Sequence, residues 1–331
     1  MKASGTLLLR RTEVAELLSI EECIAAVEQA FKLHGEGQTT PPGILGVHAR
    51  DGGFHIKAGL LDLNRSYFAA KVNANFPQNV KRFALPLIQG VIVLCDGENG
   101  YPLALMDSIE ITIQRTGAAT AVAAKYLARP DSKIVTICGC GNQGQVSLRA
   151  LAKLFSLEHV FAYDSDGAQA ERFASKLSEE LRIEIEAVRE LEKAVKRSDI
   201  LITCTPSKEP FLKREFVAPG TFVAAVGADS PEKQELDPAL MSRNKIVVDV
   251  LEQCASIGEL HHALDAGMIT KESVHAELGA VVAGIKTGRI SSDEIIIFDS
   301  TGMALQDVVA AVAVYEKALS AGRGTLWQLS D

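Results

Sequence analysis

The stretch CGCGNQG at residues 138–144 constrains the fold more than any other part of the sequence. It follows the apolar run IVTI, typical of a buried strand, and precedes QVSLRALAKLF, which has the apolar spacing of a helix. Its glycines match the G-x-G-x-x-G pattern of a turn that holds a dinucleotide. Gly139 would permit the tight turn, Gly141 the approach of a pyrophosphate, and Gly144 close packing of helix on strand.

Strand and helix signals alternate after this point, which predicts a parallel sheet covered by helices on both faces. The expected strands are 134–139, 159–164, 199–205, 221–227, 245–250 and 294–299. The residues before the glycine stretch show a different pattern of predicted helices and strands. A helix is expected at 19–37, where Ser19 and Glu22 form a capping box, followed by short extended pieces between 44 and 96. Further helices are expected at 109–128 and 302–322.

Length and composition set broad limits. A chain of 331 residues predicts two domains, and 47% apolar with 23% charged residues is typical of a globular protein. The net charge of −8, without a basic cluster, argues against nucleic-acid binding. No apolar run approaches the roughly 20 residues that span a bilayer. The three-leucine run near the start is too short for a signal-peptide core, so we expect a cytoplasmic enzyme.

The cysteines of the glycine stretch raise a second interpretation, a metal or redox site. Cys138 and Cys140 stand one residue apart and lack the further pair of ligands that zinc needs nearby. They lie in or beside apolar runs, where cysteine behaves as a small buried hydrophobic residue. We therefore expect no metal and no disulfide framework.

An acidic residue in the right place supports dinucleotide binding. Asp164 follows the next strand, 20 residues after Gly144, where a carboxylate accepts hydrogen bonds from ribose hydroxyls and repels a 2′-phosphate. The sequence therefore favours NAD(H), with NADP(H) possible because Ser165 and Asp166 could alter this preference.

Polar residues after other strands are further candidates, because ligands bind beyond the carboxyl ends of parallel strands. They are Thr205-Pro206-Ser207, Asp229 in GADSPEKQEL, and Ser300 in the last strand's loop. Asp229 fits two interpretations equally: a carboxylate that manages a proton beside the nicotinamide, or a helix N-cap.

Three cations in the N-terminal region are candidates for binding an anion. Lys71 lies in a strand on the face opposite Ala70 and Val72, and a charge so embedded usually has a partner. That partner is either a substrate carboxylate or a structural aspartate. Arg115 lies in an apolar helix start, where its planar fork suits a carboxylate or phosphate. Lys57 stands in a neighbouring extended segment.

Taken together, four segments resemble the ornithine cyclodeaminase/μ-crystallin family. They are LPLIQGVIVLCDGENGYPLALMDSIEITIQRTGAATAVAAKYLARPDS, ICGCGNQG, VGADSPEKQEL and IFDSTGMALQD, in order over about residues 40–320. The resemblance implies a homodimer with a Rossmann domain inserted in a smaller α+β domain. The expected bounds are 1–115 plus 303–331 for the substrate and dimerisation domain, and 116–302 for the NAD-binding domain.

The resemblance also implies roles for single residues. The family's catalytic lysine and aspartate fall at Lys71 and Asp229, and its arginine and threonine at Arg115 and Thr116, between substrate carboxylate and cofactor phosphate. The full expected cofactor set is Arg115, Thr116, Gly139, Gly141, Asn142, Gln143, Gly144, Asp164, Thr205, Pro206, Ser207, Val226, Gly227 and Ser300.

One departure from the family bears on the substrate. Gly43 stands near where many members have arginine, and PPGILGVHARDGGFHIKAGLL shows no obvious glutamate for holding a diamino acid. Lys57 is the expected replacement for the missing cation. We therefore expect NAD(P)H-dependent reduction of a small cyclic imino acid, such as Δ1-pyrroline-2-carboxylate. The alternatives are ornithine cyclodeaminase, alanine dehydrogenase, and a non-enzymatic μ-crystallin-like protein that binds a dinucleotide or a small ligand.

Overall fold

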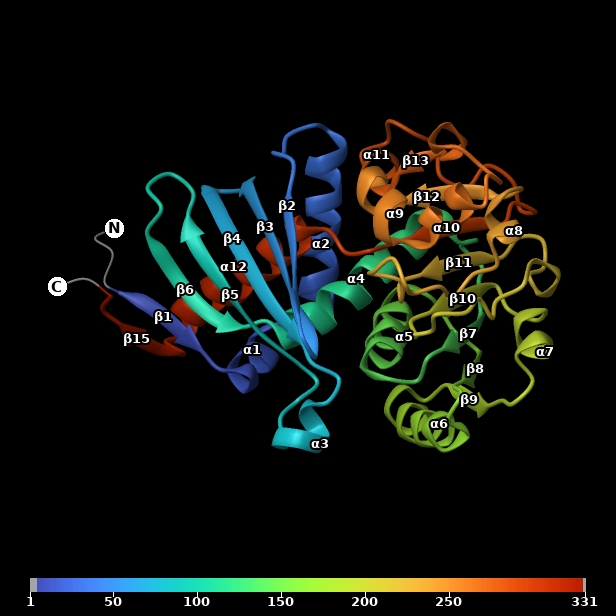
Figure 1. Ribbon diagram of the computed structural model, residues 1–331, viewed down its shortest axis with the longest axis horizontal. Helices are drawn as coiled ribbons and strands as arrows, with labels where there is room; N and C mark the ends of the chain where they lie inside the picture. Colours follow the sequence, from blue (N-terminus) through green and yellow to red (C-terminus); the bar gives the residue numbers. More distant parts are fainter. Residues whose placement is uncertain (1–4, 330–331) are drawn as a thin grey trace. The chain divides into compact units, whose positions relative to one another are not determined.

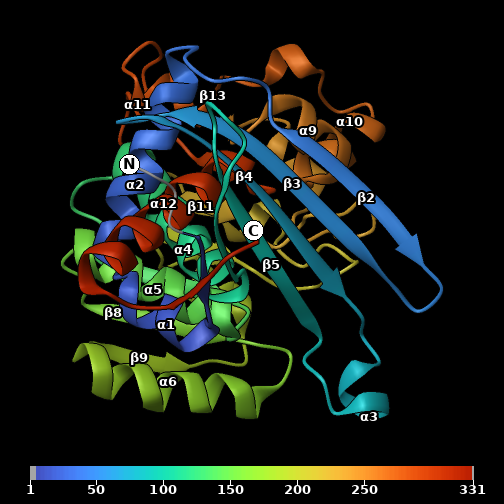
Figure 2. The ribbon, with the colours of Figure 1, turned by 90° about the vertical axis from the view of Figure 1, so that its left-hand side faces the viewer.

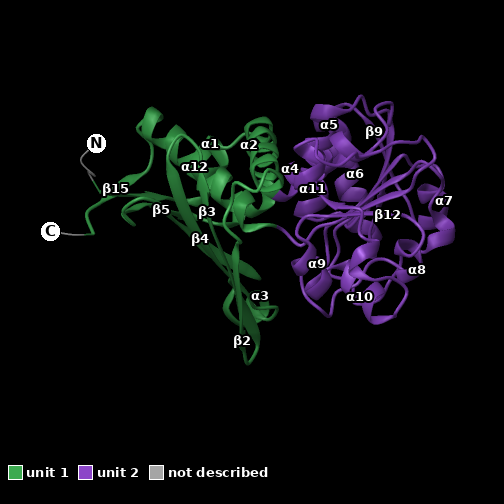
Figure 3. Ribbon diagram, turned by 90° about the horizontal axis from the view of Figure 1, so that it is seen from above, with its two compact units in different colours: residues 1–115, 303–331 green, residues 116–302 purple. Residues whose placement is uncertain are grey.

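The structure, a computed structural model, describes residues 5–329. Its chain forms two compact units, Met1–Arg115 with Met303–Asp331 and Thr116–Gly302 (Figure 3). Both ends of the chain therefore contribute to the first unit, and the middle of the chain makes the second. Within residues 5–329, no helix combines the length and apolar character needed to cross a membrane.

The first unit contains a seven-stranded sheet in the order β15-β1-β6-β5-β4-β3-β2 (Figure 1). Only β1 and β6 pair in parallel; the other neighbours are antiparallel. The extended segments predicted between residues 44 and 96 are confirmed as β2–β5, which run side by side in Figure 2. The strands are β1 (Thr6–Leu9), β2 (Gly43–Ala49), β3 (Gly52–Asp62), β4 (Ser66–Asn75), β5 (Ile88–Asp96), β6 (Pro102–Asp107) and β15 (Thr325–Trp327).

Helices α1 (Arg11–Leu17), α2 (Ile20–Gly35) and α12 (Ala304–Ala321) cover one side of this sheet, and the short helix α3 (Asn79–Phe83) lies in the connection from β4 to β5. The capping box predicted for α2 is present, since the backbone N–H of Glu22 donates to Ser19 Oγ and that of Ser19 to the Glu22 carboxylate. The last helix, α12, packs against α2, β3 and β4.

Strand β4 shows why a lysine reaches the interior of this unit. Successive side chains of a strand point to opposite faces. Tyr67, Ala69 and Lys71 are buried, whereas Ala70 and Val72 are only partly buried. The buried face of β4 is the one that α12 covers, and Lys71 ion-pairs with a residue of that helix.

The long helix α4 (Ile109–Leu127) confirms the helix predicted at 109–128, within one residue. Its first turns, up to Arg115, belong to the first unit and the remainder, from Thr116, to the second. Its alanine-rich second half is almost entirely buried.

The second unit contains an eight-stranded, wholly parallel sheet in the order β13-β12-β14-β11-β10-β7-β8-β9. This confirms the predicted doubly wound α/β fold and its six strands. They are β7 (Ile134–Cys138), β8 (His159–Tyr163), β10 (Ile200–Thr203), β11 (Phe222–Ala225), β12 (Lys245–Val248) and β14 (Ile296–Asp299). Two edge strands were not predicted, β9 (Glu184–Ala187) and β13 (Ala276–Glu277). The first carries charges and the second has only two residues, so neither gives a buried-strand signal.

The helices of the second unit follow its strands. They are α5 (Asn142–Leu154), α6 (Gly167–Leu181), α7 (Leu191–Val195), α8 (Pro238–Met241), α9 (Leu251–Ile257), α10 (Glu259–Asp265) and α11 (Leu278–Val282), with two 3₁₀ turns at Arg214–Phe216 and Lys271–Ser273. The connection from β7 to α5 is the glycine stretch, which therefore lies at the carboxyl edge of the sheet.

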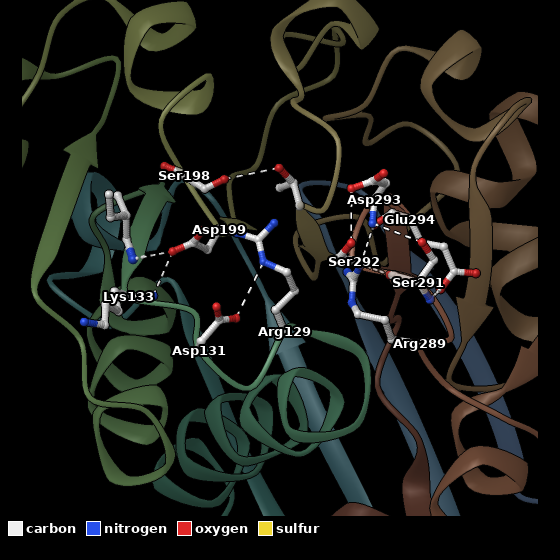
Figure 4. A network of polar contacts seen from close by, with 12 residues as sticks. Arg129, Asp131, Lys133, Ser198, Asp199, Arg289, Ser291, Ser292, Asp293 and Glu294 are labelled. Carbon is white, nitrogen blue, oxygen red and sulfur yellow. Dashed lines mark hydrogen bonds and ion pairs between the residues drawn. The ribbon is translucent and has the colours of Figure 1, made fainter.

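A polar network ties together the opposite, amino edge of this sheet (Figure 4). Asp199 precedes β10, and its carboxylate accepts from the backbone N–H groups of Lys133 and Ile134 at 2.8 and 2.9 Å. It also pairs with Arg129 at the end of α4. The Asp199 side chain is only 18% exposed, so this carboxylate depends on these donors for its hydrogen bonds.

We predict that Asp199→Ala lowers the free energy of unfolding by about 2 kcal/mol, because it leaves a cation and two backbone donors without their acceptor. Urea denaturation followed by circular dichroism measures this. The matched control is Asp131→Ala, which removes an 84% exposed partner of the same arginine and should change the free energy by less than about 0.5 kcal/mol. Equal effects of the two variants would contradict the assignment.

Candidate functional site

The glycine stretch has the geometry of a phosphate-binding turn. Gly139 has φ of +104°, and a Cβ there would lie 2.8 Å from the carbonyl oxygen of Cys204. A Cβ at Gly144 would clash with the carbonyl oxygen of Gly139. At Gly141 a Cβ would meet nothing within 4 Å, so this peptide faces open space. Glycine is thus required at the first and third positions for backbone reasons, and the second leaves room for a ligand.

Helix α5 begins directly after this turn, so its amino end lies beside the open space at Gly141. Its N-cap is Gly141, which offers no side chain to the first N–H groups of the helix, and Asn142 and Gln143 make its first turn. Unsatisfied N–H groups at a helix N-terminus attract an anion. The turn therefore fits a pyrophosphate.

Asp164 is fixed beside the turn at the end of β8. One carboxylate oxygen accepts from the backbone N–H of Cys140 at 2.8 Å, and the other from that of Asp166 at 3.0 Å. Each oxygen keeps a lone pair for a further donor, as a ribose hydroxyl would require. Asp166 itself caps α6. The Cys140 thiol donates to a backbone carbonyl, and burial raises its pKa to about 12, which leaves it unreactive.

A buried glutamate that the sequence analysis missed organises two other candidate loops. Glu235 accepts from Thr203 at 2.7 Å, from both the N–H and hydroxyl of Thr205 at 2.6 and 2.8 Å, and from the N–H of Gly227 at 3.1 Å. Burial raises the pKa of Glu235, while these donors oppose the rise. The segments holding Thr205-Pro206-Ser207 and Val226-Gly227 are thus bound to one carboxylate.

Asp229 lies in the loop between Gly227 and Glu235, which are joined by a hydrogen bond. Its side chain is 58% exposed and pairs with Lys233 at 2.6 Å. Asp229 is no helix N-cap in the structure, since no helix begins at the following residues. The exposed Asp229 carboxylate therefore lies on a loop that Glu235 fastens through the Gly227 N–H, and it is already paired with Lys233. Ser300 is placed differently, because its buried hydroxyl donates to Asp249 at 2.9 Å.

In the first unit, two of the predicted cations converge on one carboxylate of α12. Lys71 Nζ lies 2.9 and 2.7 Å from the two oxygens of Asp307, and Arg115 Nε lies 3.3 Å from Asp307 Oδ1. Arg115 also donates to Gln306 Oε1 at 3.1 Å. All four side chains are buried, and together they form what we name the α12 charge cluster: Lys71, Arg115, Gln306 and Asp307.

Burial dominates the titration of this cluster. It lowers the pKa of Lys71 to about 7, against the opposing attraction of Asp307. For Asp307, burial raises the pKa, but Lys71 and Arg115 outweigh burial and hold it below its usual value. Near neutral pH, Lys71 is therefore the group of the cluster that gains or loses a proton.

Lys57 lies directly opposite Lys71 in the β3–β4 register, and its charge contributes to lowering the Lys71 pKa. Thr116 follows Arg115 in α4 but belongs to the second unit. Within residues 5–329, no group of three or more histidine, cysteine or acidic side chains is arranged to hold a metal ion.

Sequence reasoning missed Gln306, Asp307 and Glu235. The first two stand in a helix read only as amphipathic, although a Gln-Asp pair among valines and alanines is an unusual polar interruption of a buried face. Glu235 lies in GADSPEKQEL, a polar segment whose sequence gives no sign that this glutamate is buried.

Comparison with known proteins shows which family shares this sequence and fold. A family model described as "Ornithine cyclodeaminase/mu-crystallin family" matches residues 5–322. Alanine dehydrogenase of Archaeoglobus fulgidus is 42% identical over 320 residues, 97% of either chain. A solved archaeal alanine dehydrogenase dimer with bound NAD superposes with a TM-score of 0.94 at 41% identity, covering 98% of this chain and all of that one.

A second solved structure, Δ1-pyrroline-2-carboxylate reductase of Thermococcus litoralis with NADH and L-proline, has a TM-score of 0.92 at 37% identity. It covers 97% of this chain and 100% of that one. These likenesses span both units and confirm the predicted membership: the chain belongs to the ornithine cyclodeaminase/μ-crystallin family.

Proposed function

We propose that this protein is an NAD(H)-dependent oxidoreductase that reduces a small cyclic imino acid, Δ1-pyrroline-2-carboxylate or a related ketimine, to the L-amino acid. The observation that carries the proposal is the α12 charge cluster. With Lys71 protonated, Lys71 and Arg115 supply two positive charges and Asp307 one negative charge, so one further carboxylate balances the cluster. The relatives named for imine and amine chemistry support the same class of reaction.

The second unit would hold the cofactor. The N–H groups of Gly141, Asn142 and Gln143 would bind the pyrophosphate, and Asp164 would accept from the ribose hydroxyls. A carboxylate there favours NAD(H) over NADP(H), and the solved relatives contain NAD or NADH. When bound, NADH supplies the hydride that the imine carbon receives.

In this proposal, side chains of the protein bind the substrate and handle its proton. Lys71 and Arg115 pair with the α-carboxylate and orient the imine. Asp229 stabilises the iminium charge or delivers its proton, which its exposure on a tethered loop allows. Lys71 and Asp229 are the proposed catalytic residues, with Lys57 as a further cation beside the substrate.

The second candidate function is alanine dehydrogenase, which the name of the 42% identical relative favours. The imine of pyruvate and ammonia carries the same single carboxylate, so the same cluster would bind it. Ornithine cyclodeaminase and a μ-crystallin-like binding protein are the remaining alternatives, and the same assay separates them.

We predict that purified protein oxidises NADH with Δ1-pyrroline-2-carboxylate, and that Asp229→Ala lowers kcat about 10²–10⁴-fold. NADH absorbance measures both. Parallel assays use NADPH, pyruvate with ammonium, and ornithine with NAD⁺. No oxidation of either cofactor with any imine would refute the reductase, and proline formed from ornithine without net NADH would establish the cyclodeaminase.

The control for Asp229→Ala is Glu232→Ala, which removes another exposed acid from the same loop. It should keep kcat within about twofold of the parent protein, as surface substitutions usually do. Parent-like turnover by Asp229→Ala would show that this aspartate is not the catalytic acid.

We also predict proton uptake when a carboxylate binds. Lys71, with its pKa lowered to about 7, is mostly neutral at pH 8, and an incoming anion favours its charged form. Binding of pyrrole-2-carboxylate to the NADH-loaded protein should therefore take up close to one proton at pH 8 and almost none at pH 6, so its affinity falls as pH rises above 7. Calorimetry in buffers of different ionisation enthalpy measures the uptake.

Lys71→Met is the matching variant, because it keeps the length of the chain but cannot take up a proton. Uptake at pH 8 that persists in Lys71→Met would assign the proton to another group.

We further propose that the protein acts as a cytoplasmic homodimer. The face of the first unit's sheet opposite α12 carries a groove of about 500 Å³ with a mostly apolar lining, to which Arg11, Gln89 and Asp107 add polar groups. Its apolar lining includes Phe54, Val72, Ala74, Pro86, Ile88 and Val91. Exposed apolar patches of this kind mark interfaces, and the solved alanine dehydrogenase relative is a dimer.

We predict that Val91→Asp, which places a charge on this 41% exposed position, converts the dimer to a folded monomer. Light scattering after size exclusion measures the mass. Ile285→Asp, at a 61% exposed position of the second unit, is the control and should remain dimeric. A parent protein that is already monomeric would exclude the proposed interface.

A further inference from the structure

We propose that Gln306 is a substrate-binding residue: its amide nitrogen donates a hydrogen bond to the carboxylate that Lys71 and Arg115 attract. This inference rests on the proposed function, since it names a further donor for the same ligand. Gln306 lies in the first turn of α12 and is not among the site residues expected from the glycine turn, the strand ends or the family segments.

The orientation of the Gln306 amide follows from its neighbour. Arg115 Nη1 donates to Gln306 Oε1 at 3.1 Å. A guanidinium can only donate, so the oxygen of the amide must face Arg115 and the nitrogen must face away from that bond. The usual ambiguity between the two ends of a glutamine is thereby removed.

The nitrogen so oriented has no protein partner. Gln306 is fully buried, and its Nε2 makes no hydrogen bond within the described chain. The nearest anion in sequence, Asp307, is already shared between Lys71 and Arg115. A buried N–H₂ without an acceptor is costly, so its retention needs an explanation.

The surroundings favour an anion as the missing acceptor. Gln306 lies in the first turn of the 18-residue helix α12, whose N-cap, Met303, makes no side-chain hydrogen bond. The amino end of a helix carries positive partial charge. With Arg115 and Lys71 beside it, a neutral donor there faces a potential that draws in a carboxylate rather than a cation.

The donors also suit the shape of a carboxylate. Arg115 Nη1 donates to Gln306, whereas its buried Nε lies within ion-pair distance of Asp307 but makes no hydrogen bond, so the guanidinium has unused donor capacity for a ligand. One ligand oxygen can accept from the guanidinium and the other from Gln306 Nε2, because these two groups are held side by side by their own hydrogen bond. Lys71 adds charge without a fixed direction.

The test compares two substitutions that separate donation from the support of Arg115. Gln306→Glu keeps an oxygen for Arg115 but replaces the donor with a second acceptor. Gln306→Met removes both. Gln38→Glu, on an exposed loop of the same unit, controls for the added negative charge. Calorimetry of NADH-loaded protein with pyrrole-2-carboxylate gives Kd, and cofactor fluorescence gives Kd for NADH.

We expect Gln306→Glu to raise the Kd for pyrrole-2-carboxylate about 10- to 100-fold, as loss of a hydrogen bond to a charged group does. Gln306→Met should raise it as well, while Gln38→Glu and the Kd for NADH should stay unchanged. Parent-like carboxylate binding by Gln306→Glu would overturn the proposal, since Gln306 then only supports Arg115. So would a weakened NADH Kd with unchanged carboxylate binding.

The outcome is separable from that of the proposed function. If the parent protein reduces no imine but binds pyrrole-2-carboxylate, and Gln306→Glu weakens that binding, the carboxylate site stands and the reductase does not. If the parent protein binds no pyrrole-2-carboxylate at all, the inference on Gln306 fails, whatever substrate is turned over.

Discussion

The buried ion pair between Lys71 and Asp307 is the interaction on which the first unit's chemistry depends. It joins β4 to α12 across 236 residues of sequence, so the last helix must return to the first unit after the second is complete. Burying two charges costs several kcal/mol per ion, and the attraction between them often only restores that loss. An apolar pair would hold β4 to α12 as well. The charges are therefore better explained by what they bind than by stability.

The second unit uses buried carboxylates in another way. Glu235 and Asp249 accept mainly from backbone N–H groups and hydroxyls of loops that follow the strands, as Gly227 and Gly302 illustrate. Glu259 in turn accepts from the backbone N–H groups of residues 235 and 236 at 2.7 and 3.0 Å. Loops lack a ladder of their own, so their N–H groups need such acceptors. The loops that face the cofactor edge are thereby fixed in advance, which spares a ligand the cost of ordering them.

The features that the sequence predicts well are local ones. About ten residues are enough to recognise the glycine turn, the capping box of α2 or a buried strand, because backbone sterics and the side-chain period act at that range. Gln306, Asp307 and Glu235 gain their meaning only from partners far along the chain. Lys71 lies between these cases: strand alternation predicts its burial and its need for a partner, but not that Asp307 is that partner. Its place after a strand makes Asp229 a candidate but leaves a helix N-cap equally open, and the family resemblance is what favours a catalytic role.

The charge balance of the α12 cluster also bears on which substrates it can accept. A diamino acid brings a second ammonium group that needs an acceptor near the carboxylate site. Asp307 is already shared between Lys71 and Arg115, and Lys57 stands across the strands from Lys71, so a second ammonium would meet cations. A substrate with one carboxylate and one imine nitrogen meets no such conflict, whether cyclic or acyclic. The choice between Δ1-pyrroline-2-carboxylate and the imine of pyruvate then depends on the apolar volume beside that carboxylate. The two imines differ by two ring carbons, and each is worth about 1–3 kcal/mol in such a pocket, so we expect both imines to be reduced, with clearly unequal efficiency.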